Sequence, residues 1–144
     1  TVYGGGGIMP DLFIPADTSN YTDYYRSLFR KNIINSFTLE YADKNRKKIA
    51  AEYKTFEDFK KRFSFSSEEI GSLIKKADES GLKYNDTQFQ ISKAEILNIM
   101  KALIASNLWQ TNEYFRILNE GDVVIEKALQ VVSDKVAYNK ILGY

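Results

Sequence analysis

Proline is confined to the first 15 residues of this 144-residue chain. Pro10 and Pro15 are the two prolines, and four of the eight glycines lie in the same short stretch. Proline removes a backbone donor and clashes with the preceding helical turn, so a long proline-free sequence favours helices. The chain therefore divides near Asp17 into a short extended arm, residues 1–17, and a helical body, residues 18–144.

Apolar residues recur at helical spacing along this body, and capping residues precede several of the apolar stripes. Ser66 and Glu69 form a capping box, and Gly81 suits the left-handed cap at the other end of that helix. The set that begins at Ile96 and is spaced i, i+3, i+4, i+7 marks the longest predicted helix, which ends near Trp109. The other expected helices lie at about 22–48 (one helix or two joined helices), 55–63, 111–118 and 122–136. The sequence thus predicts an all-α, irregular bundle of about six helices without internal repeats.

The arm alternates in polarity as an extended chain does. One side carries Ile8, Leu12 and Ile14, and the other carries Met9, Asp11 and Phe13. Its two prolines argue against a long central strand. A segment this short cannot bury its own apolar side chains, so we expect it to need a partner surface, either the helical body or a second chain.

Composition excludes several classes of site. The chain has no cysteine and no histidine, which excludes disulfides, Cys/His zinc sites and a Ser-His-Asp triad made by this chain alone. No apolar run is long enough to span a membrane. The glycines at 4–7 are not followed by the Lys-Ser/Thr of a phosphate-binding loop, so a tight bend is the better interpretation. We assign no catalytic residue, no cofactor and no metal.

Basic residues concentrate between Lys44 and Arg62. They are Lys44, Arg46, Lys47, Lys48, Lys54, Lys60, Lys61 and Arg62. Two interpretations stay open: a nucleic-acid-binding face, or a solvated helix face in which Glu52, Glu57 and Asp58 balance the bases. The interleaved acids and the net charge of +1 favour the second, so we expect duplex DNA binding to be weak and to fade with salt.

The arm contains one distinctive motif, Gly-Gly-Ile-x-Pro-Asp, formed by Gly6, Gly7, Ile8, Pro10 and Asp11 and followed by the apolar stretch that ends at Pro15. This motif resembles the end of the peptidase core in carboxy-terminal processing (tail-specific) serine proteases. The longer string TVYGGGGIMPD, running into the Tyr-rich TSNYTDYY, is similar to Bacteroidetes-type envelope members of that family. The resemblance, counted over the motif and the arm around it, covers about a tenth of the chain.

The resemblance implies a serine endopeptidase that cuts substrates near their C-termini with a Ser nucleophile and a Lys base. In that family both residues, and the PDZ domain that receives substrate tails, lie upstream of the motif, so no catalytic residue is carried over to this chain. The five motif residues match as structural residues only. The chain begins at Thr1 without Met or a signal peptide, which predicts a fragment or a processed product.

The resemblance also implies a location in the periplasm or cell envelope. The expected role is that of a C-terminal helical domain, inactive by itself, that serves scaffolding, oligomerisation, or docking of a partner or substrate. The expected partners are the peptidase core of the same polypeptide, a second copy, and protein substrates of the parent enzyme. The alternative is an independent helical binding module that binds nucleic acid weakly through Lys44–Arg62.

Overall fold

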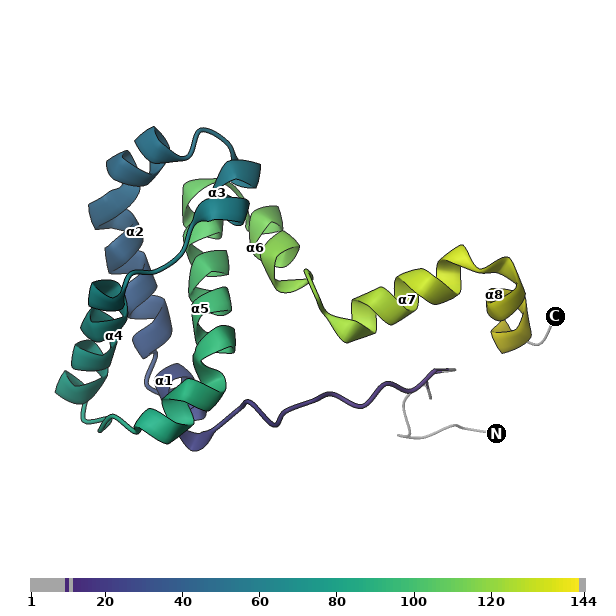
Figure 1. Cartoon of the computed structure of the whole chain (residues 1–144), viewed down its shortest axis with the longest axis horizontal. Coiled ribbons are helices and arrows are strands. Elements are labelled where there is room, and N and C mark those ends of the chain that lie inside the picture. Colours follow the sequence, from purple (N-terminus) through teal and green to yellow (C-terminus); the bar gives the residue numbers. More distant parts are fainter. Residues whose placement is uncertain (1–9, 11, 143–144) are drawn as a thin grey trace, which may run out of the picture. The chain divides into compact units, whose positions relative to one another are not determined.

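The computed structural model describes Pro10 and residues 12–142, and within this range the chain is all-helical, without strands (Figure 1). The all-α fold class predicted from the sequence is confirmed. The helices, in chain order, are α1 (Asp23–Arg30), α2 (Ile33–Glu52), α3 (Phe56–Arg62), α4 (Ser67–Glu79), α5 (Asp86–Leu108), α6 (Thr111–Leu118), α7 (Val123–Ser133) and α8 (Lys135–Leu142).

The described residues hold eight helices where the sequence predicts about six, because two expected helices are each interrupted. Asn32 adopts the left-handed conformation, with φ of 56°, and this separates α1 from α2. Asp134 leaves the helical conformation after α7, and its carboxylate accepts hydrogen bonds from the backbone N–H groups of Val136 and Ala137. Asparagine tolerates the left-handed region and aspartate is a strong N-cap, so both breaks have a local chemical cause.

The helix ends follow the predicted capping chemistry. The Ser66 hydroxyl accepts from the backbone N–H of Glu69 at 3.2 Å, and the Glu69 carboxylate accepts from the backbone N–H of Ser66 at 2.7 Å. At the other end of α4, Gly81 has φ of +75°, and the N–H of Leu82 reaches back to the carbonyl of Ala77 at 2.9 Å. This arrangement satisfies carbonyl groups that the end of a helix otherwise leaves without partners.

Contacts divide the chain into two compact units. One is Thr18–Glu120, and the other combines Thr1–Asp17 with Gly121–Tyr144. The sequence predicts one helical domain over residues 18–144, whereas contacts in the structure group residues 121–144 with the arm. Periodicity identifies helices, but it does not show which helices share a core.

The unit Thr18–Glu120 has a core of two apolar clusters, and α5 contributes to both. The first cluster joins α1, α2, α4 and α5 through Tyr24, Leu28, Ile33, Ile34, Phe37, Leu73, Ala77, Phe89, Ile96 and Met100. The second joins α2, α3, α5 and α6 through Ile49, Tyr53, Phe56, Phe59, Phe63, Ala102, Ile104, Ala105 and Ile117. The mid-chain phenylalanines are therefore core residues, and Figure 1 shows α5 between α2 and α6.

A polar junction fixes the start of α1 on α5. Ser92 is fully buried, and its hydroxyl donates to the carbonyl of Asn20 at 2.5 Å and lies 2.8 Å from the Thr22 hydroxyl. One turn earlier on α5, the Gln88 side chain accepts from the backbone N–H of Tyr24 at 2.7 Å. The first N–H groups of a helix have no hydrogen-bond acceptor within that helix. At the start of α1, a side chain of α5 provides such an acceptor.

We therefore expect Ser92→Ala to lower the free energy of unfolding by about 1–3 kcal/mol, because it leaves the partly buried groups at Asn20 and Thr22 without this partner. Ser72→Ala is the matched control, since Ser72 also bonds a backbone carbonyl but is exposed. Urea unfolding of both variants checks this. Equal, small losses would contradict the role assigned to the junction.

Candidate functional site

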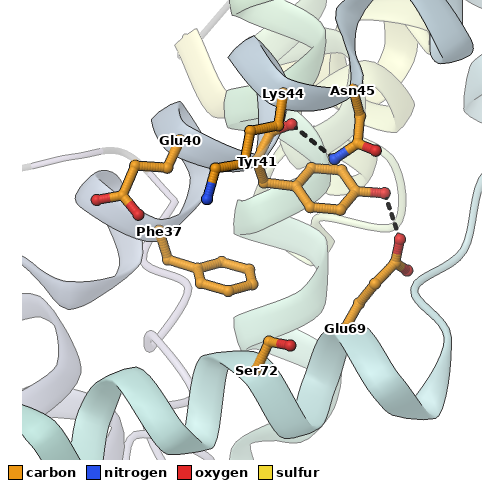
Figure 2. Close-up of a pocket in the computed structure, with 7 residues that line it drawn as sticks. All are labelled: Phe37, Glu40, Tyr41, Lys44, Asn45, Glu69 and Ser72. Atoms are coloured by element: carbon orange, nitrogen blue, oxygen red, sulfur yellow. Dashed lines mark hydrogen bonds between the residues drawn. The ribbon is translucent and has the colours of Figure 1, made fainter.

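A small pocket lies between α2 and α4 (Figure 2), with a volume of about 170 Å³. Its walls mix aromatic and charged side chains. The lining residues are Phe37, Glu40, Tyr41, Lys44, Asn45, Glu69 and Ser72. The α2 members recur at helical spacing and so share one face of that helix, which is why residues from 37 to 45 can line one pocket.

Tyr41 and Glu69 meet inside this pocket, as Figure 2 shows. The Tyr41 hydroxyl donates to the Glu69 carboxylate at 2.5 Å, and the second oxygen of that carboxylate serves the α4 capping box. Burial, followed by this hydrogen bond, raises the pKa of Tyr41 well above its usual range. A phenol held so firmly in its neutral form is a poor base or nucleophile near neutral pH. The pair links α2 to α4 instead.

The charged residues of the pocket have structural partners too. Glu40 forms an ion pair with Lys76 of α4 at 2.5 Å, and the hydrogen bond from Lys76 lowers the pKa of the Glu40 carboxyl group. Ser72 donates to the backbone carbonyl of Glu68. Glu40 is thus paired with a lysine of α4, and the Ser72 hydroxyl is engaged with the backbone of its own helix. The pocket is suited to holding two helices together rather than to chemistry.

A larger and more apolar groove lies within the unit formed by the arm and residues 121–144. Its volume is about 360 Å³, more than twice that of the first pocket. The arm contributes Pro10, Leu12 and Ile14, α7 contributes Val124, Ala128, Val131 and Val132, and α8 contributes Tyr138 and Ile141. An apolar concavity of this size is a typical binding surface, so we take it as the candidate functional site.

The extended arm presents alternate side chains to this groove, as its sequence predicts. Leu12 and Ile14 line the groove, whereas Phe13 between them does not and is 77% exposed. Pro10 is the only member of the Gly-Gly-Ile-x-Pro-Asp motif that lies among the described residues, and it lines the groove as well. The other four motif residues, Gly6, Gly7, Ile8 and Asp11, lie outside the described residues.

The last apolar stripe predicted from the sequence does form on α7, but it is not a core stripe. No residue of α7 is buried. Leu129 and Val132 are 62% and 67% exposed, and Val136 lies beyond the break at Asp134 with 79% exposure. The stripe faces the groove and solvent instead of a packed interior.

The basic region from Lys44 to Arg62 does not form an uninterrupted cationic face. Arg62 pairs with Asp58, which lowers the pKa of that carboxyl group through a direct hydrogen bond. Lys60 pairs with Glu120 at 3.1 Å, and Arg46 donates to the carbonyl of Asn107 and lies 3.6 Å from Asp43. Arg46, Lys60 and Arg62 are thus engaged with acidic side chains or backbone carbonyls, as the second of the two interpretations expects.

No group of three or more acidic side chains among the described residues is placed to hold a metal ion. No helix in the same part of the chain is both long enough and apolar enough to cross a membrane.

Comparison with known proteins gives a family. A family model described as a family of unknown function, DUF8443, matches residues 24–110, more than half of the chain. The chain belongs to this family. The DUF8443 match covers α1 to α5, while the arm, α7 and α8 lie outside it. No curated protein and no solved structure matches the chain.

Sequence reasoning missed the Tyr41–Glu69 link and the polar junction at Ser92. Glu69 is identified from the sequence only as half of a cap, because its second partner is 28 residues away on another helix. Gln88, Ser92 and Glu95 do carry a signal, since they are polar residues spaced i, i+4, i+7 along a buried helix. That spacing places them on one face, but it does not identify α1 as the element they contact.

Two Tyr→Phe substitutions should change stability in opposite directions. Tyr41→Phe removes the bond to Glu69 and should lower the free energy of unfolding by about 1–2 kcal/mol. The hydroxyl of Tyr24 is buried and has no hydrogen-bond partner among the described residues, so Tyr24→Phe should be neutral or stabilising by up to about 1 kcal/mol. Each variant is the control for the other in thermal and urea unfolding, and losses of the same size in both would refute this account.

Stability should fall in alkaline solution. Burial, the first cause, raises the pKa of Tyr24 and of Tyr25 to about 12. A folded-state pKa above the unfolded value contributes stability that is fully present below about pH 10 and is lost as the pH rises toward 12. Urea unfolding between pH 8 and 11.5 checks this, and Tyr24→Phe should make the decline shallower. A decline that is equally steep in Tyr24→Phe would contradict the assignment.

Proposed function

We propose that this chain is the non-catalytic C-terminal helical domain of a tail-specific serine endopeptidase, and that it serves as a docking and scaffolding element. The observation that carries this proposal is the groove in which the arm meets α7 and α8. The arm continues directly from the Gly-Gly-Ile-x-Pro-Asp motif on which the protease resemblance depends. Its apolar residues 12 and 14 face a concave surface that is suited to contact with another polypeptide.

The chemistry of the described side chains supports a non-catalytic role. Burial and the hydrogen bond to Glu69 keep Tyr41 neutral. Lys101 donates hydrogen bonds to the backbone carbonyls of Lys60 and Phe63 at 2.7 and 2.9 Å. Burial lowers the pKa of Lys101, which would suit a general base, but its amino group is engaged as a hydrogen-bond donor to both carbonyls. Lys101 therefore holds the end of α3 against α5.

The proposed setting is the periplasm or cell envelope, in keeping with the resemblance. The proposed partners are polypeptides: the peptidase core of the parent enzyme, its protein substrates, or another copy of the domain. The DUF8443 region supplies a stable helical body, and the groove outside that region supplies the contact surface. The ion pairs within Lys44–Arg62 make nucleic acid the weaker alternative.

The proposal is tested by comparing this chain with the product of the reading frame that encodes it. We expect that frame to extend upstream into Ser and Lys peptidase motifs, and its product to hydrolyse an unstructured protein. The 144-residue chain alone should show no turnover, and Ser→Ala in the upstream motif should abolish the activity of the longer product.

Two results would overturn this proposal. One is a reading frame whose upstream part encodes no such peptidase. The other is turnover that remains with the 144-residue chain through repeated purification, since the chain would then have an active site of its own.

A further inference from the structure

Another concave surface lies in the main helical unit, between α5 and the connection from α3 to α4, and its volume is about 260 Å³. The lining residues of α5 are Ala94, Leu97, Asn98 and Lys101, and the connection contributes residues 63–65. The α5 residues recur at i, i+3, i+4 and i+7, so they share one face of that helix. We call this surface the Lys101 groove.

The Lys101 groove combines apolar walls with one charge. Phe63 and Phe65 line it with rings whose centroids are 5.0 Å apart and whose planes are nearly perpendicular, and Ala94 and Leu97 line it from α5. Among the lining residues that the structure describes, Lys101 is the one that carries a charge. Such a lining favours a ligand that joins an apolar part to a single negative charge.

The ammonium group of Lys101 has a hydrogen-bond donor to spare. It donates to the carbonyls of Lys60 and Phe63 at 2.7 and 2.9 Å, and a lysine ammonium has three N–H groups. The third N–H has no acceptor within the described part of the chain. The Phe59 ring centroid lies 6.0 Å from Nζ, at the limit of a cation–π contact. One donor is therefore available to a ligand in the groove.

The charge of Lys101 also lacks an ion-pair partner among the described residues. Burial has the largest effect on the pKa of Lys101 and lowers it, Glu120 raises it, and Lys60 lowers it again. Glu120 forms its ion pair with Lys60 instead, at 3.1 Å. Because charges that are removed from water are ordinarily paired, an anion in the groove would supply the partner that the protein does not.

The dimensions of the groove set the size of this anion. Ala94 and Lys101 are seven positions apart, which corresponds to roughly 10 Å along the helix. Pockets for drug-sized ligands have volumes of about 300 Å³ or more, so a groove of 260 Å³ suits a smaller molecule. A peptide tail would bring backbone polar groups into contact with walls that are mainly apolar, which is unfavourable.

We propose that the Lys101 groove binds a small apolar monocarboxylate, with its carboxylate against the ammonium group of Lys101 and its tail along Leu97 toward Ala94. A hydrogen bond between two charged groups is stronger than one between neutral groups. Asn98 lies three residues before Lys101, and its side-chain amide, which has no hydrogen-bond partner within the described part of the chain, can donate to the same carboxylate.

This site goes beyond the docking role proposed above. The Lys101 groove lies within the region matched by the DUF8443 model, whereas that role depends on the arm, α7 and α8. The two proposals therefore stand or fall separately.

Octanoate is the probe, and NMR of the isotope-labelled 144-residue chain at neutral pH follows its binding. We expect saturable shifts in the amide signals of residues 63–65 and 94–101. Octan-1-ol has the same tail without the charge, and it should bind at least about tenfold more weakly, because it forms no charge-assisted hydrogen bond.

Asn98→Asp tests the electrostatic part of the site without touching the two carbonyl contacts of Lys101. The new carboxylate lies at i, i+3 from Lys101 and takes the place of the ligand, so octanoate should bind at least about tenfold more weakly. Asn98 is exposed, so circular dichroism should show an unchanged fold. Asn112→Asp is the matched control, because it makes the same change at an exposed position of α6 and should bind octanoate as the unmodified chain does.

Four outcomes would overturn the inference. Octan-1-ol could bind as tightly as octanoate, the shifts could be confined to α7 and α8, or Asn98→Asp could bind octanoate as well as Asn112→Asp does. The fourth outcome is a short peptide ending in leucine that binds at residues 63–65 and 94–101 more tightly than octanoate, since the occupant would then be a polypeptide tail.

Discussion

Burial of α5 on two sides is the constraint on which the main helical unit depends. Phe89, Ile96 and Met100 enter the cluster shared with α1, α2 and α4, and Ile104 enters the cluster shared with α3 and α6. A helix apolar around most of its circumference is stable only when other helices surround it. The long α2 contributes to both clusters as well, so α2 and α5 together fix where the four shorter helices can pack.

Polar groups within this unit decide the details that apolar packing leaves open. The Ser92 hydroxyl donates to the backbone just before α1, and the Glu69 carboxylate accepts from both a cap and Tyr41. Lys101 donates to the carbonyls at the end of α3. Each of these side chains satisfies backbone or hydroxyl groups that would otherwise be buried without partners, at a cost of about 1–3 kcal/mol each. The interior polar residues therefore position the helices. The side chains that could act as an acid or a base are already engaged in these hydrogen bonds.

The proposed contact surface lies in the other unit, where large apolar side chains are exposed. The DUF8443 match stops at residue 110, before α7 and outside the groove. A self-sufficient helical body joined to an incompletely buried contact element is a reasonable construction for a domain that binds another polypeptide. On α7 the apolar residues recur at helical spacing without being buried, although such a pattern ordinarily lies in the core.

The sequence by itself determined the all-α class, the capping box at Ser66 and the alternation of Leu12, Phe13 and Ile14. These features depend on proline, glycine, capping residues and periodicity, all of which act within a few residues along the chain. The helix breaks at Asn32 and Asp134 depend on equally local chemistry. Because Asn and Asp also occur inside helices, the spacing of apolar residues did not predict where these breaks lie. Only the tertiary structure decided that Tyr41 meets Glu69, that Ser92 receives α1, and that the stripe on α7 faces a groove instead of a core. Those outcomes depend on which helices lie side by side, and residues far apart in the sequence carry no local signal of that choice.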